Sequence, residues 1–170
     1  MVGRRGFMLG LAGLTGGLIL GARGQAGGVD APTQPASIEP VNLSRAEWQE
    51  RLTDAEYYVL REAGTERPGS SPLNNETRPG TFVCAGCGLA LFRSEWKFNS
   101  GTGWPSFFDV MKQHIGTRED NALFVTRTEY HCTRCGGHQG HVFDDGPQPT
   151  GLRYCNNGVA LKFEPSQQAA

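Results

Sequence analysis

The chain has 170 residues, with 16 Lys and Arg against 17 Asp and Glu, and a formal net charge of −1. This length fits one domain, and the near-neutral, scattered charge argues against nucleic-acid binding and against electrostatic attachment to an acidic membrane surface. Many of the 24 glycines fall in the first 30 positions, and the others punctuate short segments. Short segments separated by turns indicate a β-rich domain.

The N-terminus has the pattern of a targeting segment. Arg4 and Arg5 precede a mostly apolar, uncharged run over residues 7–20, which is short for a bilayer span but suits a signal peptide. The arginine pair is similar to a twin-arginine signal, which predicts a bacterial protein exported to the periplasm; an uncleaved anchor is the alternative. The expected organisation is a signal peptide at 1–26, a flexible linker at 27–43, a folded domain at 44–165 and a disordered tail at 166–170.

Two capping boxes open the folded domain. Ser44 with Glu47, and Thr53 with Glu56, each pair a hydroxyl that accepts from a free helix N–H with a carboxylate that reaches back. Each box therefore predicts the start of a short helix. Gly64 is a natural C-cap for the second helix, and a long loop with three prolines follows it.

After that loop the strand signals are short and are bounded by Gly, Asn and Pro. They lie at residues 82–83, 91–92, 123–125 and 159–163. No helical period continues after the second helix. The expected fold class is mainly β with short N-terminal helices, built from antiparallel sheets.

Four of the five cysteines form two C-x-x-C pairs, each followed by glycine. Two such knuckles supply the four thiolates of a tetrahedral zinc site, and all four positions on the metal are then filled by protein. The predicted Zn²⁺ is therefore structural, one ion per chain, and it would staple the fold with about 10–16 kcal/mol of apparent binding energy. Two disulfides, or iron in place of zinc, are the alternatives. The ligands would be Cys84, Cys87, Cys132 and Cys135.

Cys155 is left over from this pattern. An odd cysteine in an exported chain is a disulfide partner in trans, a buried filler or a reactive thiol. Arg153 and Asn157 lie two residues to either side, so in a strand they would share its face, and the guanidinium would favour the thiolate. Lowering a thiol pKa of about 8.5 by about two units would ionise most of the thiol at neutral pH. These neighbours favour the reactive thiol.

Two histidines, His138 and His141, follow the second knuckle closely. They could be further metal ligands, surface groups or acid–base partners of the thiol. Four thiolates already fill one metal ion, and Asp144 or Asp145 could orient a histidine by accepting a ring proton. A cysteine with histidines, an aspartate and an arginine fits nucleophilic thiol chemistry with a proton donor.

The segment 101–107 places Trp104 and Phe107 beside glycines and a proline. Such a segment is usually core, but it can also form the wall of a pocket. Taken together, these motifs resemble the B-type methionine sulfoxide reductases over about residues 44–163. The resemblance is carried by the segments 103–107, 138–143, 145–147 and 153–157, and by matches near the start within 47–68.

The resemblance implies a fold of two antiparallel sheets stapled by a four-cysteine zinc site. It also implies an activity in protein repair, the reduction of the R epimer of peptide-bound methionine sulfoxide. Specificity for one epimer is a property of the enzyme class. Cys155 would be the nucleophile and His141 the acid. Trp104 would hold the S-methyl group of the substrate, with Phe107 in the same aromatic wall. The supporting catalytic residues would be His138, Arg153, Asn157 and Asp145.

In the implied mechanism, Cys155 attacks the sulfoxide sulfur and becomes a sulfenic acid. Many relatives have a second, resolving cysteine where this chain has Thr102, so the chain resembles the single-cysteine members, which need an external thiol or a thioredoxin-like reductant. Asn156 and Gly158 are milder departures without an evident consequence. The competing hypotheses are a non-enzymatic zinc-ribbon module that binds a protein partner, and a rubredoxin-like iron protein.

Overall fold

The computed structural model describes residues 37–121 and 125–167. The expected signal peptide, most of the linker and the last three residues of the tail lie outside these ranges. At the described end of the linker, the Val41 amide donates to the carbonyl of Arg134 at 2.7 Å. No helix in the described ranges is both long and apolar enough to cross a lipid bilayer.

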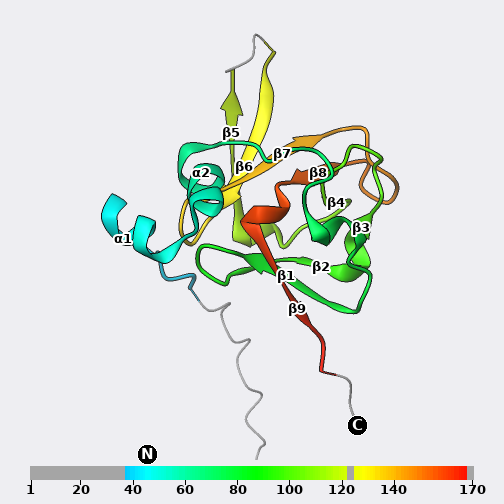
Figure 1. Cartoon of the computed structure of the whole chain (residues 1–170). Helices are drawn as coiled ribbons and strands as arrows, with labels where there is room; N and C mark the ends of the chain where they lie inside the picture. The colour runs from blue at the N-terminus through cyan, green and yellow to red at the C-terminus, as the bar shows by residue number, and fades with distance from the viewer. Residues whose placement is uncertain (1–36, 122–124, 168–170) are drawn as a thin grey trace, which may run out of the picture. The chain divides into compact units, whose positions relative to one another are not determined.

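Both capping boxes form and begin the two helices, α1 (Arg45–Arg51) and α2 (Asp54–Glu62) (Figure 1). In each box the N-cap hydroxyl accepts from the amide of the glutamate three residues later, whose carboxylate accepts in turn from the N-cap amide. The expected C-cap is wrong by one residue. The cap of α2 is Ala63, whose φ of 53° places it in the left-handed region, and Gly64 follows it.

Gly64 leaves space for the ring of Tyr58 and is not the cap residue. A β-carbon at this position would collide with the ring of Tyr58, which lies in α2. The glycine therefore lets the chain leave the helix across the Tyr58 ring, toward the loop that later forms one wall of the candidate site.

In the described residues the strands form two antiparallel sheets (Figure 1). The smaller sheet has the order β2-β1-β9, and the larger has the order β3-β4-β8-β7-β6-β5. Together with the two helices, they confirm the expected mainly β class. The strands are β1 (Gly80–Cys84), β2 (Ala90–Arg93), β3 (Lys97–Phe98), β4 (Ser106–Phe107), β5 (Ile115–Asp120), β6 (Arg127–Cys132), β7 (His138–Phe143), β8 (Arg153–Asn156) and β9 (Leu161–Pro165). The short 3-10 helices are η1 (Pro72–Asn75), η2 (Ser94–Trp96), η3 (Lys112–His114) and η4 (Gly158–Ala160).

The expected strands are partly found. Residues 82–83 and 91–92 lie in β1 and β2, whereas Val159 and Ala160 belong to η4 and only the residues from Leu161 onward join β9. Of the expected strand at 123–125, the first two residues lie outside the described ranges, and Val125 is exposed and lies in a bend. The segment instead lies between β5 and β6 in the chain, and the charged residues of these two strands do not give an apolar strand signal.

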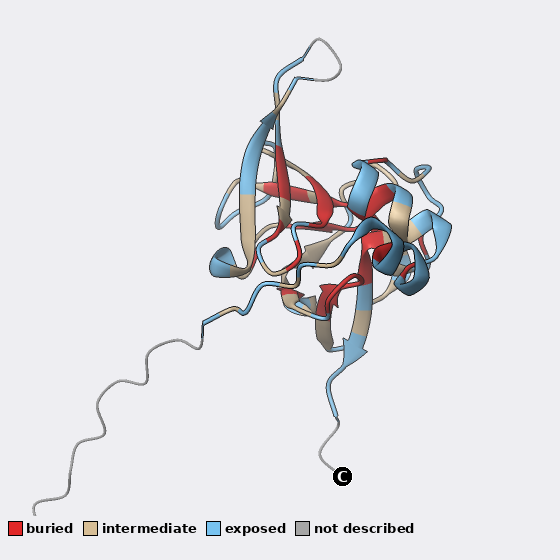
Figure 2. Cartoon of the chain, turned by 90° about the vertical axis from the view of Figure 1, so that its left-hand side faces the viewer, coloured by how far each residue is buried: buried red, intermediate tan, exposed pale blue. Residues whose placement is uncertain are grey.

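The core lies where the two sheets pack on each other, and it is largely aromatic. Phe92 of β2 stacks on Phe107 of β4 with ring centroids 4.0 Å apart, and Phe82 of β1 meets the same ring edge-on at 5.0 Å. Tyr130 and Tyr154 extend the cluster along the larger sheet. The buried stretches gather in the interior of the domain (Figure 2). Burial of this core holds β8 and β7 rigidly in place, and these strands carry most of the predicted site.

Candidate active site

The two C-x-x-C knuckles converge on one point. Their four sulfur atoms lie within 4.8 Å of one another, with Cys84 Sγ 3.7 Å from Cys135 Sγ and Cys87 Sγ 3.5 Å from Cys132 Sγ. A tetrahedral ion with metal–sulfur bonds of about 2.3 Å requires sulfur–sulfur edges of about 3.8 Å. A disulfide requires about 2.05 Å. The donor set therefore fits one metal ion and does not fit two disulfides.

A row of polar side chains crosses the larger sheet. In the strand register, Cys155 of β8 lies opposite His141 of β7, His141 lies opposite Glu129 of β6, and Glu129 lies opposite Arg118 of β5. Directly opposed residues on adjacent antiparallel strands have β-carbons about 4.5–5.5 Å apart. The candidate nucleophile and the candidate acid are therefore cross-strand neighbours, backed by a carboxylate and a guanidinium.

A β-bulge places both predicted histidines on this face. His138 pairs with His131 and Gly140 pairs with Tyr130, so Gln139 is an extra residue in β7. Without it, residues three apart would point to opposite faces of the sheet. The bulge brings the His138 and His141 rings to a centroid separation of 5.5 Å.

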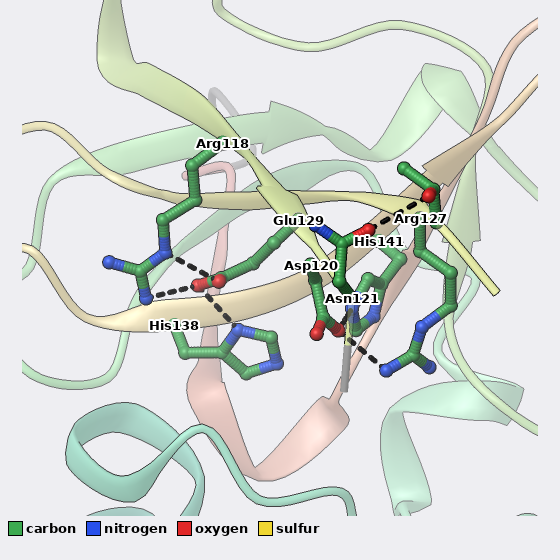
Figure 3. Close-up of polar contacts among 8 residues, drawn as sticks. Arg118, Asp120, Asn121, Arg127, Glu129, His138 and His141 are labelled. Carbon is green, nitrogen blue, oxygen red and sulfur yellow. Dashed lines mark hydrogen bonds and ion pairs between the residues drawn. The ribbon is translucent and has the colours of Figure 1, made fainter. Parts of the chain in front are cut away.

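His141 is held by a carboxylate from β5 (Figure 3). Its Nε2 lies 2.7 Å from Asp120 Oδ2, and the same oxygen accepts from Arg127 Nη2 at 2.6 Å. A carboxylate accepts hydrogen bonds, so Nε2 of His141 carries a proton in this contact. The His141 side chain is 11 % exposed and is the histidine that reaches the pocket.

His138 is more deeply buried and has a separate partner (Figure 3). Its Nδ1 lies 2.8 Å from Glu129 Oε1, and Arg118 donates to both oxygens of that carboxylate at 2.6 and 2.7 Å. Burial lowers the pKa of His138, so the ring is neutral at pH 7. Burial opposes ionisation of Glu129, yet hydrogen bonds from Arg118 and His138 outweigh it and its pKa is lowered. The group forms a charged support behind His141.

The expectation that Asp144 or Asp145 orients a histidine is wrong. Both carboxylate oxygens of Asp145 accept from Arg153, at 2.7 and 2.8 Å, and this bidentate pair lowers the pKa of Asp145. The Arg153 guanidinium also stacks over the ring of Phe143 at 4.3 Å. Asp145 therefore fixes the arginine that lies beside Cys155.

A pocket of about 120 Å³ opens at Cys155. A larger groove of about 520 Å³, between α2, the following loop and η4, contains no cysteine or histidine among the described residues, so the smaller pocket is the candidate site. The small pocket brings together four of the predicted residues, namely Cys155, His141, Trp104 and Asn157. The other three, His138, Arg153 and Asp145, do not line it. It is lined by Thr65, Trp104, Arg127, Gly140, His141, Phe143, Cys155, Asn156 and Asn157.

Phe107 does not line this pocket. It is fully buried and stacks on Phe92 in the core, so its prediction as a substrate-binding residue is wrong. Strand alternation is the reason: Ser106, its neighbour in β4, pairs with Cys155, and Phe107 points to the opposite face of the sheet. The aromatic side chains at the pocket are Trp104 and Phe143.

The environment of Cys155 in the unliganded site favours the protonated thiol, because its pKa is raised. Burial raises its pKa, and the charge of Arg153 together with hydrogen bonds from Thr102 and Arg153 reduces this rise without reversing it. The expectation that Arg153 makes most of the thiol ionised is therefore wrong for the free protein. The arginine is already paired with Asp145, which weakens its effect on the sulfur.

A loop after α2 closes the pocket through Glu66. Its carboxylate accepts from the amides of Gly158 and Val159 at 2.5 and 3.1 Å, and its own amide donates to Asn157 Oδ1 at 3.0 Å. The carbonyl of Glu66 accepts from the indole Nε1 of Trp104 at 3.1 Å. Asn157 and Trp104 are thus fixed to each other through one loop residue.

Comparison with known proteins assigns this arrangement to a family. The family model for the SelR domain matches residues 52–165. The chain belongs to the SelR-domain family. The predicted boundary at residue 44 adds α1 to the part that the model matches.

Several relatives of this SelR domain share a name. The chain is 50 % identical over 129 residues to the peptide methionine sulfoxide reductase MsrB of Methanosarcina barkeri, covering 75 % of this chain and 91 % of the relative. The protein of the same name from Agrobacterium fabrum is 52 % identical over 126 residues, covering 74 % and 93 %. That of Bradyrhizobium diazoefficiens is 49 % identical over 137 residues, covering 80 % and 98 %.

Sequence reasoning missed the carboxylates that support the histidines in this SelR domain. Asp120 with Arg127, and Arg118 with Glu129, are facing pairs in the β5–β6 hairpin. The signal was present as charges two residues apart on both sides of a turn, Arg118 and Asp120 before it and Arg127 and Glu129 after it. Opposite charges at that spacing predict one polar face on two paired strands.

Proposed function

We propose that the chain reduces the R epimer of peptide-bound methionine sulfoxide to methionine, as a protein-repair oxidoreductase. The observation that carries the proposal is Cys155 lying opposite His141 in the strand register, in a pocket that Trp104 also lines. Family membership and the shared name of the relatives support the same activity. Specificity for one epimer follows the enzyme class.

In the first step of the proposed reaction, the groups at the pocket account for every atom that is transferred. The Cys155 sulfur attacks the sulfoxide sulfur, and the oxygen passes to Cys155 as methionine leaves. The protonated thiol brings the hydrogen that the sulfenic acid requires, so methionine sulfoxide and a thiol give methionine and a sulfenic acid without an outside proton. Nε2 of His141 donates its proton to a hydrogen bond with Asp120. Nδ1 then takes the proton of the Cys155 thiol and gives it to the oxygen that the sulfoxide transfers to Cys155.

The other side chains position these two groups. Arg153 favours the thiolate at the moment of attack, and Asp145 fixes the guanidinium in place. Trp104 presents an indole face to the S-methyl group, and its Nε1 is fixed on the Glu66 carbonyl. Asn157 holds the Glu66 loop, and the His138–Glu129–Arg118 group supports the His141 ring from behind.

We propose Zn²⁺ as the metal of the four-cysteine cluster. Four thiolates at tetrahedral spacing suit Zn²⁺, and they leave no open position for substrate. The ion would be a structural staple between the smaller sheet and the β6–β7 turn. Iron also accepts four thiolates, and its colour would distinguish it.

Regeneration requires two electrons from outside the domain. With Thr102 at the site where many relatives have a resolving cysteine, and with the other four cysteines in the cluster, we propose that an external thiol or a thioredoxin-like protein reduces the sulfenic acid. Two thiols from the reductant become one disulfide, and the oxygen leaves as water.

We also propose that the protein is exported through a twin-arginine route. Arg4 and Arg5 before an apolar run support this proposal, and folding before export would allow the metal to bind in the cytoplasm. Fractionation of cells that express the full chain should place the mature protein in the periplasm, with an N-terminus near residue 26. Replacement of both arginines by lysine should retain it in the cytoplasm.

One assay tests the activity. The purified protein is given the two sulfoxide epimers of a methionyl peptide with dithiothreitol, and the loss of each epimer is measured. We expect the R epimer alone to disappear; loss of neither would favour a non-enzymatic metal-binding module. After one equivalent of substrate without reductant, mass spectrometry should find one added oxygen on Cys155, and an intramolecular disulfide of Cys155 would contradict the single-cysteine mechanism.

A further inference from the structure

Two amide side chains lie fully buried between the metal-binding cluster and the strand that carries Cys155. Gln139 of β7 and Asn156 of β8 are both 0 % exposed. A buried amide costs free energy unless its donors and acceptors are paired. Both amides are paired, and their partners lead from one site to the other.

The contacts form a continuous chain. Gln139 Nε2 donates to the sulfur of Cys84 at 3.3 Å, and Gln139 Oε1 accepts from Asn156 Nδ2 at 3.5 Å. Asn156 Oδ1 accepts in turn from the buried hydroxyl of Tyr130 at 2.6 Å. The same Asn156 Nδ2 donates to the carbonyl of Asn157 at 2.7 Å. The chain passes directly beside Cys155, the residue before Asn156.

The main chain of the bulge adds a second connection. The carbonyl of Gln139 accepts from both the amide and the side chain of Asn157, at 2.9 and 3.0 Å. Asn157 holds the Glu66 loop at the pocket. The residue that bulges out of β7 therefore touches a metal-ligand sulfur with its side chain and the end of β8 with its backbone.

A metal-bound thiolate gives this chain a fixed direction. Such a sulfur only accepts hydrogen bonds, so the Gln139 amide must turn its NH₂ toward Cys84 and its oxygen toward Asn156. Asn156 must then donate to Gln139 and accept from Tyr130. A free thiol both donates and accepts, so it does not impose this order.

We propose that Gln139 is a positioning residue that couples the metal-binding cluster to the geometry of Cys155. Metal binding sets the amide orientation of Gln139, and through Asn156 it fixes the segment of β8 on either side of the reactive sulfur. The inference rests on the proposed metal site and on Cys155 as the reactive thiol.

The test uses the full-length, Zn²⁺-bound protein and a Gln139→Leu variant. Leucine fills a similar volume without hydrogen bonds, and Gln139→Met serves as the second variant if leucine prevents folding. Two rates are measured: transfer of Zn²⁺ to a chelator, and alkylation of Cys155 by iodoacetamide with the site read by peptide mass spectrometry. Tyr130→Phe is the matched control, because it removes only the far end of the chain.

We expect Zn²⁺ transfer from Gln139→Leu to be about ten-fold faster, as for other groups that hydrogen-bond to metal ligands. Alkylation of Cys155 in the still metal-bound variant should be about three-fold faster, because a loosened β8 admits water and relieves the desolvation that keeps the thiol protonated. Tyr130→Phe should also speed alkylation but leave Zn²⁺ transfer within about two-fold of the wild type, because it lies beyond the metal contact.

Faster Zn²⁺ transfer with unchanged alkylation would overturn the coupling and leave Gln139 as a local support of Cys84. Both rates unchanged would overturn it altogether. Neither rate depends on turnover, so a wild-type protein that fails to reduce either epimer but shows the expected variant rates would refute the proposed function alone. A wild-type protein that binds no Zn²⁺ would overturn the inference while leaving the epimer assay to decide the activity.

Discussion

The five cysteines lie in two regions, one that suits a structural role for sulfur and one that suits a reactive role. In the cluster, sulfur–sulfur contacts of 3.5 and 3.7 Å join the four cysteines in two pairs, and the geometry suits one ion with no open position. In the pocket, Cys155 has no sulfur partner among the described residues, and its neighbours include a histidine, an arginine and a threonine. The four cluster cysteines are buried, whereas Cys155 is only partly buried at its pocket. The neighbours decide whether a thiol is structural or reactive.

The largest effect should come from replacing the reactive sulfur. Cys155→Ser should lower sulfoxide reduction by on the order of 10⁴-fold or more, because an alcohol is a far weaker nucleophile than a thiol at this site. Zn²⁺ content and the thermal unfolding midpoint should match those of the wild type. Substantial residual turnover by Cys155→Ser would show that Cys155 is not the reactive thiol, and the contrast between the pocket and the cluster would be lost.

The converse change should affect the fold first. Cys132→Ser, or removal of the metal by a chelator, should cost most of the domain's net stability, which for a small domain is about 5–15 kcal/mol. Near-UV circular dichroism should lose its tertiary signal together with activity. Full activity after verified metal removal would refute the structural role of the cluster.

The pH dependence of Cys155 alkylation sharpens the contrast further. Because burial raises the pKa of this thiol above 9.0, iodoacetamide should react slowly at pH 7 and faster as pH rises through the folded-state pKa. The protonated thiol stabilises the fold fully below the pKa that the thiol has in the unfolded chain. This stabilisation is lost as the pH rises through the higher pKa of the folded state. Arg153→Met should move the midpoint upward, since the guanidinium favours the thiolate. A midpoint near neutral pH in the wild type would contradict the assigned direction.

The smallest effect should separate the two aromatic residues predicted for substrate binding. Phe107→Leu should destabilise the fold by roughly 1–3 kcal/mol and leave KM unchanged, because the ring is stacked in the core. Trp104→Leu should raise KM with little loss of stability, because the indole lines the pocket. Urea unfolding and steady-state kinetics on both variants measure this difference. A raised KM for Phe107→Leu at unchanged stability would restore it to the binding site.

Local rules predicted the parts of the molecule that depend on neighbouring residues. The capping boxes at Ser44 and Thr53, and the two C-x-x-C knuckles, form as expected because each is complete within a few residues. The grouping of Cys155 with the two histidines was a hypothesis from their residue types, and the family resemblance singled out His141 as the acid. The cross-strand pairing of Cys155 and His141 depends on a register that neither segment encodes alone.

Two errors about the site residues share a physical cause, which is the direction that each side chain takes. Phe107 was assigned to the pocket although alternation in β4 directs it to the core, and Asp145 was assigned to a histidine although it pairs with Arg153. The bulge at Gln139 reverses alternation within β7, and its effect cannot be read without the partner strand. Charged β5 and β6 lacked the apolar pattern by which strands were recognised.

Glu66 has a consequence for how substrate enters. Its side chain and amide bind the start of η4 and the N-cap residue Asn157, and its carbonyl binds Trp104 in a distant segment. The indole is therefore anchored before any substrate arrives, and an oxidised methionine meets a preformed recess rather than a flap that must fold over it. A ready-made recess requires the oxidised residue itself to be accessible, so exposed, pliable stretches of damaged proteins should be repaired ahead of methionines in intact cores.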